Sequence, residues 1–368
     1  MKLKVIAHKL LKRMKTELAY TTFKSDRTKM NRIISDLGER DIETIKYSEL
    51  TEYVNELHLK YAASTVNAHR SLLNKIFLQA HADGLIKKNL VTQVPSFKRD
   101  IEEPTPFTRE EIQKIISDPL SSPVVILLFQ LGIHTGLRIS EILALCWEDI
   151  DLKKRVLYVR RSVTDSKYRV PKTDKSRRTI ELSTLACDLL EKLMLFSGTL
   201  RPKNIQVVQS DNHTQKKEKV RFVFINPQTK KPFSGSKQYA ASFFTPMLSR
   251  LNVKHRGPGH IRHTFASQSL TCGTPISWIS MQMGHTGSQL TERRYARWIT
   301  QNNQTDYADR LATHIGLPHQ DTALPQGNLN TMKKSNIDSI NHQQLLQTLS
   351  LLSSPDLADA LFSSTSRR

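Results

Sequence analysis

The segment HTGLRISEILALCW, residues 134–147, carries the clearest structural pattern in the chain. In it Ile139, Ile142, Leu143 and Cys146 stand at i, i+3, i+4 and i+7, which predicts an amphipathic helix with one apolar face. An apolar face of this kind has to be buried against other elements. The segment therefore predicts a helix in the core of a larger domain.

The sequence on both sides of this segment predicts a mainly helical domain with a small β-sheet, of the α+β class. Before it, Thr108-Arg-Glu-Glu111 has the spacing of a capping box and precedes one helix, and a second helix is expected over 124–131. After it, RVLYVRRSV (155–163) and RRTIELS (177–183) predict two strands. Further helices are expected over about 184–196 and between 239 and 295, whereas the polar insertion 199–220 is expected to be a mobile loop.

The first hundred residues predict a small, basic, all-helical domain. Its clearest helix runs from Ser64 to Ala82, ends before Gly84, and has one apolar face formed by Leu72, Leu73, Ile76, Phe77 and Ala80. Residues 1–16 contain six basic residues and no acidic one, which fits either a solvated, frayed helix or an arm that contacts DNA. We expect the helical domain over 17–98, a proline-rich linker over 99–107 and a second domain over 108–312.

The charge of the chain indicates a polyanionic partner. The formal net charge of the 368 residues is +21, which suggests DNA, RNA or an anionic membrane surface. Residues 301–368 hold six acidic and five basic residues, so the first 300 residues carry +22. The tail over 313–368 is polar and is predicted to be disordered, apart from a short helix near 344–361.

Composition also argues against several other classes of protein. The three cysteines lie far apart with no CxxC pair, which argues against a disulfide framework or a cysteine zinc site. No apolar run approaches the roughly 18–20 residues that span a bilayer, and the basic N-terminus lacks the apolar core of a signal peptide. A role of residues 1–16 at a membrane surface has no second anchor to support it.

Four short segments contain residues that are suited to chemistry: TGLRISE (135–141), PKTDKSRR (171–178), GHIRHTFAS (259–267), and MGH (283–285) with Tyr295 ten residues later. Each alone has an ordinary explanation. Arg138 can pair with Glu141 one turn away, a lysine in a basic turn is usually solvated, and Tyr295 can be a core aromatic. Their combination and order call for a common explanation.

Taken together, Arg138, Lys172, Arg262, His285 and Tyr295 in these segments resemble the tyrosine recombinase (phage integrase) family, over roughly residues 20–300. The resemblance implies a helical, SAM-like core-binding domain and a catalytic domain. It also implies site-specific DNA recombination through a 3′-phosphotyrosyl intermediate, for the integration and excision of a mobile element. Open alternatives are DNA inversion or dimer resolution by the same chemistry, a type IB topoisomerase-like enzyme, and a DNA-binding regulator that does not cleave.

The resemblance implies a role for each residue, and the chemistry explains the residue types. Arg138 and Arg262 would bind the oxygens of the scissile phosphate, since guanidinium groups are permanently cationic and bidentate. Tyr295 would attack the phosphorus, with its phenolate made accessible by the neighbouring cations. His285 would orient or stabilise the phosphate in the transition state, and Glu141 would position Arg138.

Two assignments leave an alternative open. Lys172 matches the lysine that protonates the departing 5′ oxygen in the family, and Lys175 is the competing candidate. Many family members have His-x-x-Arg where this chain has Gly259-His260-Ile261-Arg262, so the register places Gly259 at the position of the histidine. Either a small backbone shift lets His260 serve, or the site works without that general base.

The resemblance also implies which partners the chain needs. The phosphotyrosyl link conserves bond energy, so no ATP, metal or other cofactor is expected, in keeping with a sequence that has no GxxxxGK[ST] loop and no clustered metal ligands. The expected partners are double-stranded DNA recombination sites and a homotetramer on two duplexes, with accessory DNA-bending or directionality proteins as further candidates. Residues 299–316 are the segment expected to dock on a neighbouring protomer. The expected location is the cytoplasm of a prokaryote, at the nucleoid, with no membrane association.

Overall fold

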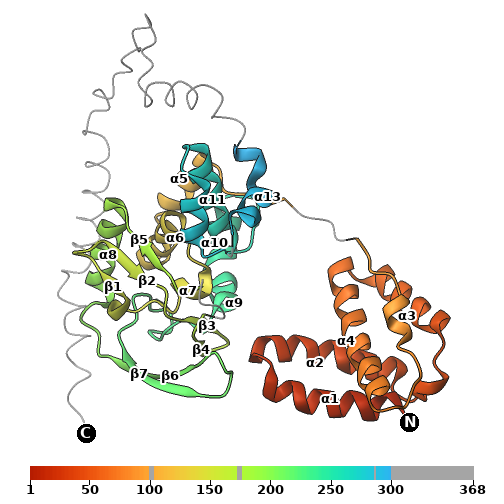
Figure 1. Cartoon of the computed structure of the whole chain (residues 1–368). Helices are drawn as coiled ribbons and strands as arrows, with labels where there is room; N and C mark the ends of the chain where they lie inside the picture. The colour runs from red at the N-terminus through yellow and green to blue at the C-terminus, as the bar shows by residue number, and fades with distance from the viewer. Residues whose placement is uncertain (99–102, 172–175, 286, 300–368) are drawn as a thin grey trace, which may run out of the picture. The chain divides into compact units, whose positions relative to one another are not determined.

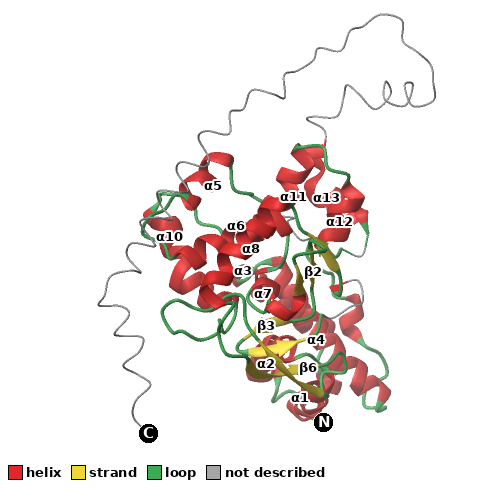
Figure 2. Cartoon of the chain, turned by 90° about the vertical axis from the view of Figure 1, so that its left-hand side faces the viewer, coloured by secondary structure: helices red, strands yellow, loops and turns green. Residues whose placement is uncertain are grey.

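The computed structural model describes residues 1–98, 103–171, 176–285 and 287–299 (Figure 1). Lys172, Lys175, residues 99–102 of the predicted linker and residues 300–368, which include the predicted docking segment beyond residue 299 and the tail over 313–368, lie outside these residues. Helices predominate and the strands are short, as Figure 2 shows, so the predicted α+β class is confirmed. None of the helices in this described part of the chain has both the length and the apolar character needed to cross a membrane.

The N-terminal part folds around a hydrophobic core of its own, made by residues between Leu3 and Val94. Its helices are α1 (Leu3–Glu17), α2 (Tyr20–Leu37), α3 (Tyr47–Lys60) and α4 (Ala63–Ala82), with short 3-10 helices at Ile42–Thr44 and Leu90–Gln93. The helix predicted over residues 64–82 is confirmed as α4, and all five residues of its predicted apolar face are buried. Gly84, just beyond its end, has a φ of 72°, which suits glycine.

The basic segment 1–16 differs from the expectation of a frayed helix. It forms α1, whose buried residues are Leu3, Ile6, Ala7, Leu10 and Met14. These residues recur at helical spacing between the lysines, so one face of α1 joins the core while the lysines occupy the opposite face. The six basic residues conceal this pattern when the segment is judged by its composition alone.

The larger part has a core around α6 (Pro123–Thr135), where Leu128, Phe129 and Leu131 are fully buried. Helices α8 (Thr184–Ser197) and α11 (His260–Thr271) pack against α6 (Figure 1). The other α-helices described in this part are α5 (Arg109–Ile116), α7 (Ile139–Ile142), α9 (Ser236–Tyr239), α10 (Thr245–Arg250), α12 (Ile276–Met283) and α13 (Ser288–Ile299), with a 3-10 helix at Trp147–Asp149 and a π-helix at Ala240–Phe244. The predicted capping box before α5 is confirmed, since Thr108 and Glu111 each accept a hydrogen bond from the other's backbone N–H.

The helix predicted over 139–146 is shorter than expected. α7 contains four residues, and the chain then leaves the helix because its backbone bonds elsewhere. Cys146 forms a β-bridge with Phe222, and the Trp147 N–H donates to the carbonyl oxygen of Arg221. Ile142, Leu143 and Cys146 are nevertheless fully buried and Ile139 is partly buried against the core around α6, so the predicted apolar face is largely confirmed although the helix ends early.

The strands form two small sheets. β1 (Ile150–Asp151), β2 (Val156–Tyr158) and β5 (Thr179–Glu181) make an antiparallel sheet, with Leu157 opposite Ile180. β3 (Ser162–Thr164), β4 (Lys167–Arg169), β6 (Lys203–Val208) and β7 (Gln215–Val220) make the other, in which β4 and β6 run parallel. The expectation of a mobile loop over 199–220 is wrong, because β6 and β7 pair in a hairpin that buries Val207 and Val220.

The burial of α1 makes a prediction for stability. Replacing Ile6, which is 2% exposed, by alanine should lower the free energy of unfolding by about 2–5 kcal/mol, because it leaves a cavity in the core. Replacing the exposed Lys9 by alanine should change it by less than about 0.5 kcal/mol. Urea unfolding measures both, and equal stability of Ile6→Ala and the unchanged protein would contradict the inclusion of α1 in the core.

Candidate active site

The tight turn after α6 places Arg138 at the start of α7. Gly136 ends α6 with a φ of 63°, and a Cβ atom at this position would lie 2.4 Å from Cδ1 of Phe265, so glycine is required for conformation and for space. Arg138 is then the N-cap residue of α7, and its backbone N–H donates to Oε2 of Glu141 at 2.9 Å. Its side chain is 42% exposed and donates from Nη1 to Oε1 of the same carboxylate.

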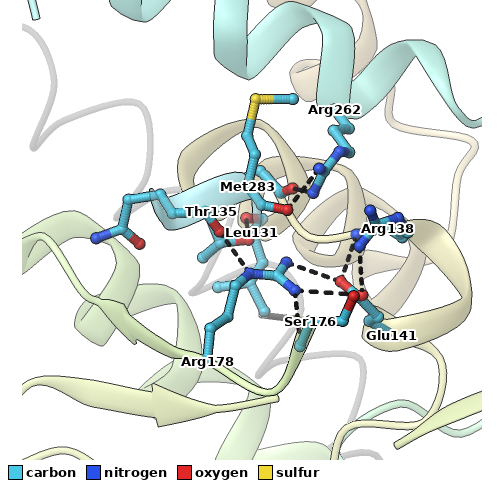
Figure 3. Close-up of polar contacts among 10 residues, drawn as sticks. Leu131, Thr135, Arg138, Glu141, Ser176, Arg178, Arg262 and Met283 are labelled. Atoms are coloured by element: carbon cyan, nitrogen blue, oxygen red, sulfur yellow. Dashed lines mark hydrogen bonds and ion pairs between the residues drawn. The ribbon is translucent and has the colours of Figure 1, made fainter. Parts of the chain in front are cut away.

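The carboxylate of Glu141 also binds Arg178, the residue immediately before β5 (Figure 3). Nη2 of Arg178 lies 2.9 Å from Oε2 of Glu141, and both side chains are about 95% buried, at 5% and 6% exposed. Nε of Arg178 donates to the carbonyl oxygen of Gln282 at the end of α12. Burial alone would raise the pKa of Glu141, but Arg178 and Arg138 outweigh burial and hold the pKa below its usual value.

Arg262 on α11 is the third guanidinium of the cluster. It is 8% exposed, and donates from Nη1 to the carbonyl oxygen of Gly136 at 2.6 Å and from Nη2 to that of Met283 at 2.5 Å (Figure 3). Burial, with the neighbouring charge of Arg138, lowers its pKa to about 9, so it remains cationic at neutral pH. Within this network three guanidinium groups face one carboxylate, which leaves an excess of two positive charges for an anion to meet.

His285 follows the end of α12 and bonds to α13. Its Nδ1 lies 2.6 Å from Oγ1 of Thr291, which lies 2.8 Å from Oγ of Ser280. Burial and the charge of Arg262 lower the pKa of His285 to about 4, so the imidazole is neutral at neutral pH. The two hydroxyl groups therefore fix the orientation of a neutral ring.

Tyr295 lies on α13, where its φ of −125° and ψ of 16° interrupt the helix. The residue is 1% exposed, and its hydroxyl lies 2.5 Å from Nδ1 of His263 on α11. Burial raises the pKa of Tyr295 to about 12, although Arg262 and Arg294 act in the opposite direction. The phenol is therefore protonated at neutral pH.

The structure places most of the predicted residues around one centre. Arg138 and Arg262 are linked through the turn at Gly136, and Arg262 is close enough to Tyr295 and His285 to shift the pKa of each. His260 is the first residue of α11, one turn before His263, and its Nδ1 lies 3.1 Å from the carbonyl oxygen of Gly257. Lys172 and Lys175 are outside the described residues.

Two residues of this centre were not predicted from the sequence. Arg178 is the last residue of PKTDKSRR, and His263 directly follows Arg262 in GHIRHTFAS. A signal for both was available, because each stands beside predicted residues in a quoted segment. Their contacts, however, are made with residues that are far away in the sequence, at Glu141 and Tyr295.

The buried carboxylate predicts a pH-dependent effect on stability. Glu141→Gln leaves Arg178 buried without its counter-charge, and should lower the free energy of unfolding at pH 7 by about 3–5 kcal/mol. The pKa of Glu141 is depressed in the folded state, so its stabilisation is present above the unfolded pKa of about 4.3 and is lost as the pH falls through the folded value.

The difference between the two proteins should therefore shrink below about pH 4, as measured by urea unfolding at several pH values. Glu17→Gln is the matched control, since Glu17 pairs with Arg13 at 3.4 Å while both side chains are 56% exposed. A deficit of Glu141→Gln that is the same at pH 7 and pH 3 would show that lost packing, and not lost charge, causes it.

Comparisons with known proteins identify the family. The phage integrase family model matches residues 106–302, more than half of the chain. In Escherichia coli strain K12 the chain is 28% identical over 326 residues to IntQ, a protein named as defective, and 28% identical over 313 residues to the prophage integrase IntR. These alignments cover 83% of this chain and 82% of IntQ, and 80% of this chain and 75% of IntR.

Two solved structures have the same fold. The integrase of transposon Tn1549, in complex with a circular intermediate DNA, is 20% identical with a TM-score of 0.67, over 86% of this chain and 99% of that one. A lambda integrase tetramer bound to a Holliday junction is 17% identical per chain with a TM-score of 0.61, over 78% of each chain. With the family match over residues 106–302, the chain belongs to the phage integrase family of tyrosine recombinases.

Proposed function

We propose that Tyr295 is the nucleophile of this integrase-type, site-specific DNA recombinase, and that Arg138 and Arg262 bind the phosphate it attacks. The observation that carries the proposal is the excess of positive charge beside a buried tyrosine, assembled from three segments far apart in the sequence. A phosphodiester is anionic, and attack adds charge to its non-bridging oxygens. The cluster is therefore better matched to the transition state than to the ground state.

The side chains have different proposed roles, which follow from their exposure and their protonation states. Arg138 is the more exposed of the two arginines and is readily available to a phosphate oxygen, whereas two carbonyl oxygens hold the guanidinium group of Arg262 in position to bind the same phosphate. If the Thr291 hydroxyl donates to Nδ1 of His285, Nε2 carries the ring proton and donates to the phosphate. Because Tyr295 is 1% exposed, DNA binding has to uncover its hydroxyl.

In the proposed reaction the Tyr295 oxygen forms a bond to phosphorus and the bond to the 5′ oxygen breaks, which leaves a 3′-phosphotyrosyl link. Lys172 supplies the proton of the 5′ hydroxyl, with Lys175 as the alternative, and both belong to the connection that leads to Arg178. His260, one turn before His263, remains a candidate for assistance at the phosphate. Rejoining is the reverse reaction with a new 5′ hydroxyl, so no nucleotide or metal is consumed.

The assembly is proposed from the same chemistry. Residues 17–98 and 108–312 would hold duplex DNA as a core-binding and a catalytic domain, with the lysines of residues 1–16 adding phosphate contacts. The lambda integrase tetramer on a Holliday junction supports a homotetramer that exchanges strands between two duplexes. Accessory DNA-bending or directionality proteins and a location at the prokaryotic nucleoid complete the proposal.

A nicked suicide substrate that carries the element's own attachment site tests the nucleophile. The unchanged protein should form a covalent protein–DNA adduct, and Tyr295→Phe should form none, because phenylalanine has no oxygen to attack phosphorus. Tyr239→Phe is the matched control, since Tyr239 is also fully buried but lies in the core around Phe244. An undiminished adduct in Tyr295→Phe would exclude Tyr295 as the nucleophile.

The proposed DNA-binding mode predicts a steep dependence on salt. A protein that neutralises about 6–10 phosphates loses roughly 10³–10⁵-fold in affinity between about 50 and 200 mM salt. We expect the full chain, with +22 in its first 300 residues, to fall in this range when the equilibrium constant is measured by fluorescence anisotropy on a duplex. A flat response would count against phosphate contacts as the main source of affinity.

A further inference from the structure

The contact between His263 and Tyr295 points to a further catalytic residue. Nδ1 of His263 lies 2.5 Å from the Tyr295 hydroxyl, and the two ring centroids are 5.8 Å apart. We propose that His263 is the general base that accepts the proton of Tyr295 as the phenol oxygen attacks phosphorus. This inference rests on the proposed role of Tyr295 as the nucleophile.

The position of His263 on α11 explains how it can act in place of the family histidine, which this chain lacks. Gly259 occupies the position of the family histidine, and His263 follows it by four residues, so both lie on the same side of the helix. The backbone N–H of His263 donates to the carbonyl oxygen of Gly259. A Cβ atom at Gly259 would have no atom within 4 Å, so that side of the first turn offers room that no side chain at residue 259 fills.

His260 is less well placed for this step. Its Nδ1 faces the carbonyl oxygen of Gly257 at 3.1 Å, and its ring centroid lies 5.3 Å from that of His263. His263 therefore stands between His260 and Tyr295 in the line of ring contacts.

The protonation states suit a base that acts during the reaction. Burial, with His260, Arg294 and Arg262 facing it from α11 and α13, lowers the pKa of His263 to about 4, so the ring is neutral above about pH 5. With the ring proton on Nε2, the lone pair of Nδ1 accepts the Tyr295 O–H. The pKa of Tyr295 is about 12, so the proton stays on the tyrosine while no DNA is bound.

The proton moves as the bond to phosphorus forms. The O–H group of Tyr295 becomes more acidic as an electron pair of its oxygen enters the new bond. The anionic phosphate offsets the free-energy cost of a buried positive charge on His263. The P–O5′ bond breaks, and the 5′ oxygen takes its proton from the general acid proposed above. On rejoining, His263 returns its proton to the departing tyrosine, so the cycle balances without a co-reactant.

The test measures the rate of adduct formation on the suicide substrate at saturating protein. His263→Asn places an amide oxygen near the position of Nδ1, and so keeps a hydrogen-bond acceptor that cannot take a proton at neutral pH. We expect this variant to be slower by about 10²–10⁴-fold. His69→Asn is the matched control with an unchanged rate, because His69 is also a buried histidine with a lowered pKa but lies on α4, where its Nδ1 is 3.0 Å from the carbonyl oxygen of Thr65.

A second measurement separates a base from a residue that only positions the tyrosine. Replacing Tyr295 by a fluorinated tyrosine of lower phenol pKa, by amber suppression, should restore most of the rate lost in His263→Asn, since a more acidic phenol needs no base. The rate of His263→Asn should also rise by about tenfold per pH unit through the neutral range, where the unchanged protein is flat. Thermal unfolding of each variant checks that it is folded.

Three results would overturn the proposal. The first is that His263→Asn forms the adduct as fast as the unchanged protein. The second is that it is slower but fluorotyrosine does not restore the rate, and the third is that its rate stays flat with pH. Each of these leaves His263 without a role as base. The failure of the proposed function looks different. In that case the unchanged protein forms no adduct, or Tyr295→Phe forms one.

Discussion

The carboxylate of Glu141 is the group on which the arrangement of the site depends. It accepts hydrogen bonds from the backbone and side chain of Arg138 and from two nitrogens of Arg178. Arg178 in turn binds the carbonyl oxygen of Gln282, so one buried negative charge joins the start of α7, the start of β5 and the end of α12. Without it, the guanidinium groups would repel one another in a medium where the repulsion is strong.

Burial acts in the same sense on the ionisation of His263, His285, Tyr295 and Arg262. It favours the uncharged form of each, so the pKa values of His263 and His285 fall to about 4 and that of Tyr295 rises to about 12. Even the pKa of Arg262 falls to about 9. A bound phosphodiester would oppose this effect of burial on the pKa of the cationic groups, since an anion beside Arg262 favours its charged form. Without DNA, the two histidines and the tyrosine are therefore neutral, whereas the guanidinium groups and the carboxylate of Glu141 are charged. The substrate supplies the missing negative charge.

The parts of this structure that the sequence predicted are those that depend on local periodicity. The apolar face of α4 and the capping box before α5 involve residues three or four positions apart, and such patterns can be counted in a single segment. The end of α7 depends instead on pairing with Phe222, and the β6–β7 hairpin depends on the burial of Val207 and Val220. Phe222 is far from Cys146 in the sequence, and the strands of the hairpin are mostly polar, so polar composition suggested a loop where a hairpin exists. In α1 the lysines concealed a regular apolar face in the same way.

The site shows the same division between local and distant information. The pair formed by Arg138 and Glu141 was expected, because the two residues are one turn apart. His263 stands next to Arg262 in the sequence, whereas the spacing of the family motif predicts a histidine at position 259, with His260 as the neighbouring candidate. A motif register counts residues along the chain, whereas a helix brings together residues separated by four. Gly259 and His263 share a side of α11 for that reason, so the base proposed for Tyr295 stands one turn of the helix from the position of the family histidine.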